Sequence, residues 1–245
     1  MLEIKNFSKS YNGSDFAIRD LNLTVCDGEI YGFIGHNGAG KSTTIKCIVG
    51  ALDFSQGEIL LDGVSIKDNP VEFKKKIAFV PDNPELYEFM TGKKYIDFIA
   101  DIYQVNKKER VELIKKYATA LELEDALGDY ISSYSHGMKQ KLALISALVH
   151  SPKLLVLDEP FVGLDPRASF NLKNIMRELT NNGVQIFFST HVLEVAEKLC
   201  DKIAIIKDGK LITCGLTEEV TKDASLEEVF LSLGDNENIE TNEGN

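Results

Sequence analysis

The chain has 245 residues, of which 44% are hydrophobic and 27% charged, and this length holds one large globular domain or two small ones. Its 38 acidic residues against 27 basic ones give a formal net charge of −11, which argues against a basic surface for nucleic acid, so we expect no nucleic-acid partner. The four cysteines lack the CxxC spacing of a zinc site, and no apolar run approaches the roughly 20 residues that span a bilayer.

The first 82 residues alternate short β-type runs with one glycine-rich loop. The run 30–35, IYGFIG, is almost wholly apolar, as expected for a strand that is covered on both faces. A helix is predicted from about Lys41 to Val49, because Gly50 is a typical residue at the end of a helix. Further strands are predicted at 2–7, 17–25, 57–63 and 75–80.

The pattern becomes helical between about Thr91 and Leu127, where apolar residues recur three and four positions apart. We interpret this stretch as a helical insert between two α/β parts. After it, the pattern predicts helices from Gly137, over 167–180 and over 193–200, and strands at 153–158, 184–190, 202–209 and 210–215. This alternation predicts an α/β fold with a mainly parallel sheet and helices on both sides. The segment 234–245 has four acids and no basic residue, which predicts a disordered tail.

One loop has the spacing that binds phosphate groups. The sequence GHNGAGKS follows the apolar strand, precedes a helix and matches the pattern GxxxxGK[ST]. Its glycines allow backbone N–H groups to curl around a phosphate, and the helix N-terminus adds a favourable dipole. Lys41 is predicted to reach the β- and γ-phosphates, and the Ser42 hydroxyl to bind Mg²⁺. The predicted phosphate loop comprises Gly35, His36, Asn37, Gly38, Ala39, Gly40, Lys41 and Ser42.

Two acids and a histidine follow apolar strands and are expected at the same edge of the sheet, where ligands bind in open parallel sheets. Asp158, after the strand LLVL, is predicted to bind Mg²⁺, and Glu159 to polarise the attacking water. His191 follows the strand FFST, and its imidazole is placed to hydrogen-bond the γ-phosphate. Tyr11 either stacks on the adenine base or fills a turn, and the residues alone leave both interpretations open.

These motifs, in this order over about 1–233, resemble the nucleotide-binding subunit of ATP-binding-cassette transporters. The resemblance implies a P-loop ATPase with an N-terminal antiparallel β portion. Its catalytic core comprises 1–82 and 135–233, and 83–134 form a helical subdomain. The resemblance also implies that the chain hydrolyses ATP with Mg²⁺ and that Tyr11 stacks on adenine. Thr43, the next residue after the phosphate loop, is expected to contact the nucleotide.

A second loop, SYSHGMKQK, also opens an apolar helix, and on its own it is compatible with a plain helix cap. The signature of the family, LSGGQ, aligns with 134–138. In this family, the signature of one subunit binds the γ-phosphate that lies in the phosphate loop of another, so two subunits face head to tail. Ser135 and the N–H group of Gly137 retain the groups that this contact needs. His136 and Met138 depart from the family pattern.

Another departure is Asp82, where the family usually has a glutamine that touches Mg²⁺ and links to the helical insert. A carboxylate oxygen also suits a hard cation, so Asp82 joins Ser42 and Asp158 as a predicted metal ligand. The segment GLDP, 163–166, aligns with the dimer-contact loop of the family.

The resemblance implies an ATPase subunit that powers transport through separate integral membrane subunits, at the cytoplasmic face of the cell membrane. A second ATPase subunit, identical or related, completes the dimer. Asp82 and the YSxGMKQ signature resemble the exporter branch, whose typical cargoes are drugs, peptides or lipids. Aromatic residues near PELYEF, 84–89, either fill the core of the insert or form a groove for a short helix of the membrane subunit.

The alternative is an ATPase of the same class that acts on nucleic acid or on the ribosome instead of in transport. Chromosome-maintenance and repair ATPases carry a long coiled coil between phosphate loop and signature, whereas here the gap is short and lacks heptads. Translation factors have paired cassettes, whereas this acidic chain has one. A non-hydrolysing regulatory cassette is disfavoured because Glu159 and His191 are both present.

Overall fold

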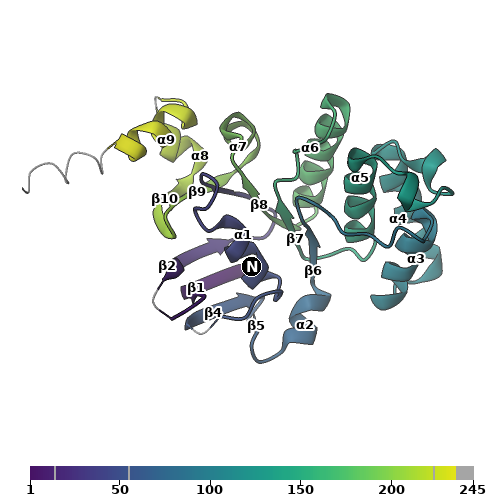
Figure 1. Cartoon of the computed structure of the whole chain (residues 1–245), viewed down its shortest axis with the longest axis horizontal. Helices are drawn as coiled ribbons and strands as arrows, with labels where there is room; N and C mark the ends of the chain where they lie inside the picture. Colours follow the sequence, from purple (N-terminus) through teal and green to yellow (C-terminus); the bar gives the residue numbers. More distant parts are fainter. Residues whose placement is uncertain (14, 55, 223, 236–245) are drawn as a thin grey trace, which may run out of the picture.

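The computed structural model describes residues 1–13, 15–54, 56–222 and 224–235, and within them the strands form two sheets (Figure 1). The antiparallel sheet has the order β2-β1-β4-β5, and the larger sheet has the order β10-β9-β3-β8-β7-β6. In the larger sheet β9, β3, β8, β7 and β6 are parallel, and only β10 pairs antiparallel with its neighbour β9. The predicted α/β fold and its N-terminal antiparallel portion are therefore confirmed. The strands are β1 (Leu2–Ser10), β2 (Phe16–Val25), β3 (Ile30–Ile34), β4 (Gln56–Leu61), β5 (Val64–Ser65), β6 (Ile77–Val80), β7 (Leu154–Asp158), β8 (Gln185–Thr190), β9 (Lys202–Lys207) and β10 (Lys210–Leu216).

The parallel strands are buried on both faces, which explains their continuous apolar sequence. In β7, Leu155 and Leu157 belong to one hydrophobic core, and Leu154 and Val156 to the other, because successive side chains of a strand point to opposite faces. One core lies between the parallel sheet, α1, α2 and the antiparallel sheet, and the other lies beneath α5, α6 and α7. The main helices are α1 (Lys41–Ile48), α2 (Pro70–Lys75), α3 (Gly92–Ile102), α4 (Lys107–Ala120), α5 (His136–Leu148), α6 (Pro166–Asn181) and α7 (Leu193–Leu199).

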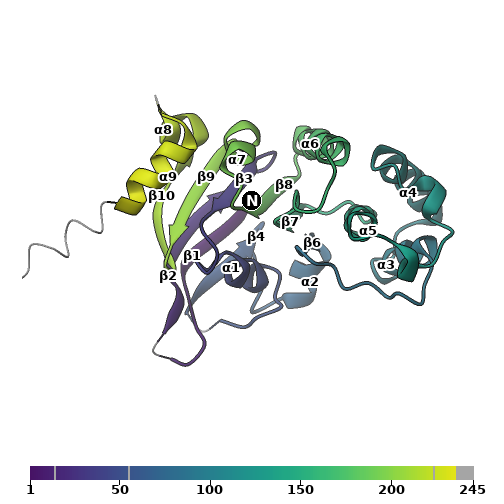
Figure 2. The ribbon, with the colours of Figure 1, turned by 45° about the horizontal axis from the view of Figure 1, so that its top comes forward.

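The stretch predicted as a helical insert forms α3 and α4, which confirms its helical character. Each helix begins with a polar cap, because Thr91 accepts a hydrogen bond from the N–H of Lys94, and Asn106 accepts one from the N–H of Lys108. The two helices lie at the end of the molecule farthest from the C-terminal helices (Figure 2). Helix α5 packs against α3, α4 and β6, and thereby joins the insert to the sheet.

The chain after β10 differs from the sequence-based expectation. Two further helices, α8 (Thr217–Thr221) and α9 (Leu226–Asp235), follow the last strand, and α9 packs against α7 and α8. The predicted tail begins inside α9, which continues to Asp235, and 236–245 lie outside the described residues. Among the helices that the structure describes, none has both the length and the apolar character needed to cross a membrane.

Candidate functional site

The phosphate loop connects the end of β3 to the start of α1, and two of its positions require glycine. Gly38 has φ of 86° and Gly40 has φ of 107°, a backbone conformation that L side chains rarely adopt. A Cβ atom on Gly40 would lie 2.6 Å from the carbonyl oxygen of Ala17 and 2.4 Å from the Ile18 side chain. A Cβ atom on Gly38 would meet no atom within 4 Å, so this part of the loop faces open space. Strand β2 thus supports one side of the loop while the other side remains accessible to a ligand.

Lys41 lies at the first position of α1 and is almost completely buried. Its ammonium group donates hydrogen bonds to the carbonyl oxygens of Gly35, at 2.6 Å, and His36, at 3.2 Å. It also lies 3.7 Å from a carboxylate oxygen of Glu159. The buried cation is therefore held by the loop that it follows and by the acid at the end of β7, and a bound triphosphate would replace these contacts.

The acid pair stands at the carboxyl end of β7 and is held by β8. The Ser189 hydroxyl donates a hydrogen bond to Asp158 and accepts one from the backbone N–H of Glu159 at 3.1 Å. Glu159 has φ of 49°, in the left-handed region that non-glycine residues seldom occupy, and such strain is concentrated at functional sites. The change of backbone direction after Asp158 explains how two adjacent acids take different positions.

His191, as predicted, emerges at the same edge as the acids, and it contacts Glu159 directly. Its Nδ1 atom lies 2.9 Å from Oε1 of Glu159, and its backbone N–H donates to Oε2 at 3.3 Å. The carboxylate of Glu159 thus lies between the imidazole of His191 and the ammonium of Lys41. Such an arrangement can orient a water molecule and a negatively charged phosphate in one place.

Lys41, Asp158 and Glu159 line one open cleft of about 380 Å³ at the N-terminal end of α1, whereas His191 lies outside its lining. Tyr11 reaches the cleft from the end of the antiparallel sheet, and its hydroxyl lies 3.1 Å from Oγ1 of Thr43. The ring of Tyr11 is largely exposed, so it does not fill a buried turn. The cleft is lined by Tyr11, Ala17, His36, Asn37, Gly38, Gly40, Lys41, Ser42, Thr43, Asp82, Asp158 and Glu159.

Some predicted site residues contribute from outside this lining. Gly35 packs so closely on β9 that a Cβ atom would lie 2.6 Å from the Ile206 carbonyl oxygen, and Ala39 is buried beneath the loop. Ser189 was assigned no role from the sequence, although it positions both acids. The sequence gives little indication of this role, because the partners of Ser189 lie about thirty residues away, at the end of another strand.

The signature residues do not line the cleft of their own chain. Ser135 caps α5, and its hydroxyl accepts a hydrogen bond from the N–H of Met138 at 3.3 Å. His136 packs on the turn before α6, where a Cβ atom on Gly163 would lie 2.6 Å from the imidazole ring. Ser135 and Gly137 therefore form a separate helix N-terminus rather than a second wall of the same cleft.

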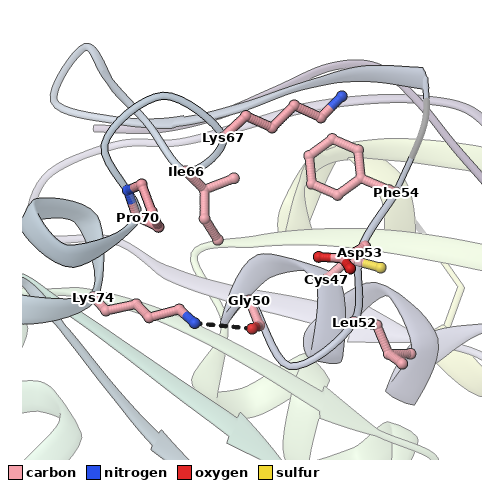
Figure 3. Close-up of a pocket in the computed structure, with 9 residues that line it drawn as sticks. All are labelled: Cys47, Gly50, Leu52, Asp53, Phe54, Ile66, Lys67, Pro70 and Lys74. Carbon is pink, nitrogen blue, oxygen red and sulfur yellow. Dashed lines mark hydrogen bonds between the residues drawn. The ribbon is translucent and has the colours of Figure 1, made fainter.

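A separate hollow of about 260 Å³ lies at the opposite end of α1 (Figure 3). Lys74 donates a hydrogen bond to the Gly50 carbonyl oxygen at 3.0 Å, and the Lys67 ammonium lies 4.3 Å from the centre of the Phe54 ring. Burial raises the pKa of the Cys47 thiol in this hollow to about 11, so the thiol is protonated at neutral pH and is a poor nucleophile. The cleft at the N-terminal end of α1 is therefore the one whose groups can bind a phosphate and orient a water molecule.

Comparisons with known proteins show the family to which the chain belongs. A family model described as ABC transporter matches residues 18–162. The SkfA peptide export ATP-binding protein SkfE of Bacillus subtilis (strain 168) is 35% identical over 212 residues, covering 86% of this chain and 87% of SkfE. A solved structure of an ATP-binding subunit of an ABC transporter is 33% identical, with a TM-score of 0.91 over 96% of this chain and 99% of the other. The dimeric structure of a post-hydrolysis state of the ATP-binding cassette MJ0796, bound to ADP and Pi, is 25% identical, with a TM-score of 0.80 over 89% of this chain and 99% of the other. The chain belongs to the ABC transporter family, as an ATP-binding subunit that is an ATPase.

Proposed function

We propose that two subunits bind ATP head to tail, each completing the cleft of the other, and that hydrolysis drives export through separate membrane subunits. The observation that carries this proposal is the position of Ser135 and Gly137, a capped helix N-terminus outside the cleft of its own chain. A helix N-terminus attracts the negative charge of a phosphate, so a second chain supplies the missing contact. The similarity to a cassette that forms a dimer with ADP and Pi supports this arrangement.

The cleft has separate groups for the base and for the triphosphate. The exposed ring of Tyr11 is the adenine platform, and its hydroxyl contact with Thr43 holds the ring next to the phosphate loop. The backbone N–H groups around Gly38 and the ammonium of Lys41 bind the phosphates. Both the adenine base and the triphosphate therefore contribute to the affinity for ATP.

Replacement of Tyr11 by alanine is expected to weaken ATP binding about tenfold, because stacking of a base on an aromatic ring contributes about 1–3 kcal/mol. Tyr11→Phe is the matched control, since it keeps the ring and removes only the hydroxyl that contacts Thr43. Fluorescence titration with a labelled ATP analogue measures both variants. Equal affinity of Tyr11→Ala and the parent chain would exclude stacking on Tyr11.

Three oxygen-bearing side chains of the cleft suit Mg²⁺, namely the Ser42 hydroxyl and the carboxylates of Asp82 and Asp158. Asp82 is exposed on the loop after β6, and one of its oxygens accepts a hydrogen bond from the N–H of Asn83 at 2.8 Å. Asp158 is buried, with Ser189 on one oxygen. When bound there, Mg²⁺ would neutralise phosphate charge.

Asp82→Asn is expected to raise the Mg²⁺ concentration for half-maximal ATP hydrolysis about tenfold, because the variant replaces a charged ligand by a neutral amide oxygen. Asp68→Asn, an exposed acid outside the cleft, is the control. Steady-state hydrolysis at fixed ATP across a Mg²⁺ series provides the measurement. An unchanged Mg²⁺ requirement would remove Asp82 from the proposed ligands.

Hydrolysis is assigned to the group around Glu159. Its carboxylate takes a proton from the attacking water, and His191 keeps the carboxylate in place through the contact at 2.9 Å. His191 also lines a hollow together with Gly35, His36 and Asn37 at the start of the phosphate loop, and we propose that its imidazole hydrogen-bonds the γ-phosphate. Loss of the γ-phosphate then removes the ligand that joins the two chains.

The energies of dimer formation are balanced. Two charge-assisted contacts from each signature, at about 1.5–3 kcal/mol each, give roughly 6–12 kcal/mol for two sites. Association itself costs about 4–15 kcal/mol, so neither contribution dominates. We therefore propose a dimer that closes with ATP and loosens after hydrolysis.

An aromatic cluster, formed by the exposed Tyr87, Phe89 and Phe98 with the half-buried Tyr95, is proposed as the contact for the membrane subunit. The Tyr87 ring lies 5.8 Å from Phe89, 5.9 Å from Tyr95 and 5.8 Å from Phe98, centre to centre. Phe89 is 74% exposed and Tyr87 48%, whereas Leu86 and Met90 beside them pack against the core. A cluster of this kind suits the apolar face of a short helix. The name of the relative SkfE, a peptide export protein, supports export.

Placing a photo-crosslinking amino acid at position 89 is expected to capture an integral membrane protein in intact cells, and the same group at position 111 is not. Val111 is the matched control because it is 66% exposed on α4 of the same insert, outside the aromatic cluster. Mass spectrometry identifies the captured protein. Capture of soluble proteins only, with no membrane subunit, would contradict the transport assignment.

A further inference from the structure

The hairpin turn between β9 and β10 contacts the phosphate loop, although the reaction described above gives this turn no role. Two residues, Asp208 and Gly209, form the turn, since Lys207 pairs with Lys210 in the flanking strands. Asp208 has φ of 47° and Gly209 has φ of 74°, the left-handed conformation that a two-residue hairpin turn requires and that Asp-Gly favours. Neither residue belongs to the lining of the cleft, so any effect on the nucleotide must pass through the loop.

Gly209 lies between the phosphate loop and β2. Its N–H donates a hydrogen bond to the carbonyl oxygen of Ala39 at 3.1 Å, and its own carbonyl oxygen accepts one from the N–H of Arg19 at 2.8 Å. A Cβ atom on Gly209 would lie only 2.6 Å from the carbonyl oxygen of Ala17. Because glycine has no side chain, the turn approaches closely enough to bond Ala39.

Asp208 faces the phosphate loop at His36, and a carboxylate oxygen of Asp208 lies 3.8 Å from Nε2 of the imidazole. Nδ1 of the same ring lies 2.8 Å from the carbonyl oxygen of Asn37. A carbonyl oxygen only accepts hydrogen bonds, so Nδ1 carries a proton and Nε2 is the atom that faces Asp208. When Nε2 is protonated too, the imidazole and the carboxylate form an exposed ion pair.

The segment 36–39 between these two contacts forms the tip of the phosphate loop. The carbonyl oxygen of His36 accepts hydrogen bonds from the N–H of Ala39 and from the ammonium of Lys41, both at 3.2 Å. On one side His36 lines the cleft, and on the other it lines a hollow of about 280 Å³ that is bordered by Phe230 of α9. The hairpin turn therefore contacts both ends of the segment whose N–H groups face the cleft.

We propose that the turn formed by Asp208 and Gly209 is a positioning element of the ATP site. Gly209 fixes the Ala39 end of the segment, and Asp208 fixes the other end through His36. This inference rests on the proposed binding of the phosphates at the loop and Lys41. A loop that is already held in its binding conformation loses less conformational entropy when the ligand binds, so the turn contributes to affinity without touching the nucleotide.

Asp208→Asn in the full chain tests the ion pair, because asparagine also tolerates the left-handed backbone. At pH 6, where an ordinary histidine is mostly protonated, the variant is expected to bind ADP about threefold more weakly, as for loss of an exposed ion pair. AMP lacks the β-phosphate, so its affinity is expected to stay unchanged. Displacement of a fluorescent ATP analogue, whose own affinity is titrated for each chain, measures both ligands. Asp62→Asn is the matched control, since Asp62 and Gly63 form a two-residue turn between β4 and β5, outside the cleft.

A double-mutant cycle determines whether Asp208 acts through His36. His36→Gln alone is expected to weaken ADP binding about threefold, and adding Asp208→Asn is expected to weaken it no further, because the pair is already lost. Independent effects would multiply to about ninefold. That result would overturn the role of Asp208 as a positioning residue.

Gly209→Ala tests the other end of the segment. The new Cβ atom would meet the carbonyl oxygen of Ala17 and displace the turn from Ala39, so ADP binding is expected to weaken about tenfold. Gly63→Ala is the matched control, because Gly63 has φ of 76° and the same backbone strain, whereas a Cβ atom there meets nothing within 4 Å. The control is expected to bind ADP like the parent chain, and thermal melts by circular dichroism check that both variants fold.

The outcomes separate this inference from the proposed function. If Lys41→Ala binds ADP as tightly as the parent chain, the phosphates do not bind at Lys41, and both are overturned. If Lys41→Ala weakens ADP binding but Asp208→Asn or Gly209→Ala does not, the positioning role is overturned and the proposed site stands. The same conclusion follows if AMP loses as much affinity as ADP, or if the controls at Asp62 and Gly63 lose as much as the variants at Asp208 and Gly209.

Discussion

Replacing Glu159 by glutamine is expected to reduce ATP hydrolysis about 10²–10⁴-fold, the usual contribution of a general base, while ATP binding is retained. The amide has nearly the size of the carboxylate, so the contacts of this side chain with the imidazole and with the backbone N–H of His191 are disturbed little. The amide lacks the charge and basicity that withdraw a proton from water. The expected product is a dimer that holds ATP and does not release it.

Two measurements check this result, phosphate release at steady state and light scattering after gel filtration in ATP and Mg²⁺. Glu194→Gln is the matched control, because Glu194 is an exposed acid on α7 that pairs with Lys198 and does not line the cleft. The control is expected to hydrolyse ATP at the parent rate. A Glu159→Gln chain that hydrolyses ATP normally would exclude Glu159 as the base, and one that stays monomeric with and without its membrane partner would exclude the switchable dimer.

Replacing Gly137 by aspartate is expected to lower ATP hydrolysis about 100-fold without changing the affinity of a single chain for ATP. The new carboxylate would lie at the helix N-terminus that we propose to bind the γ-phosphate, and like charges there repel. Gly137 does not line the cleft of its own chain, which is why binding by one chain is spared. Gly128→Asp is the control, because a Cβ atom there meets nothing within 4 Å.

Mixing two inactive variants separates a site shared between chains from a site within one chain. Lys41→Ala removes the phosphate-binding cation, and Gly137→Asp damages the signature. A mixed dimer contains one cleft in which Lys41 of one chain meets Gly137 of the other, both intact, so hydrolysis is expected to reappear on mixing. If the mixture remains as inactive as its components, a cleft completed by the second copy is excluded. If Gly137→Asp alone hydrolyses ATP at the parent rate, the signature has no part in the reaction.

Much of the site could be read from local sequence, because its parts are short and physically self-contained. The glycines before Lys41, the apolar strand that precedes them and the helix that follows form a strand–loop–helix unit within nineteen residues, from Ile30 to Ile48. The amphipathic spacing of the insert predicted α3 and α4 for the same reason. Helix α9 also has a usable signal, because Leu226, Val229, Phe230 and Leu233 lie on one helical face, although no helix was predicted between 216 and 233.

Contacts between distant segments could not be read in this way. The double role of Ser189 depends on the register of β7 and β8, in which Asp158 lies opposite Ser189. The exposure of Phe89 beside the packed Met90 depends on how the loop after β6 lies on α3. Both are set by packing between elements far apart in the chain, which composition and periodicity do not encode.

The sequence by itself determined the chemical class of the site, because a phosphate loop, an acid pair and a signature require particular residues at particular spacings along the backbone. The tertiary structure alone decided that Ser135 and Gly137 stand apart from Lys41, and that α9 forms a wall beside the phosphate loop. The physical reason is the distance along the chain over which each interaction acts. Backbone conformation and capping act over a few residues, whereas these placements follow from the burial of whole helices against a shared sheet.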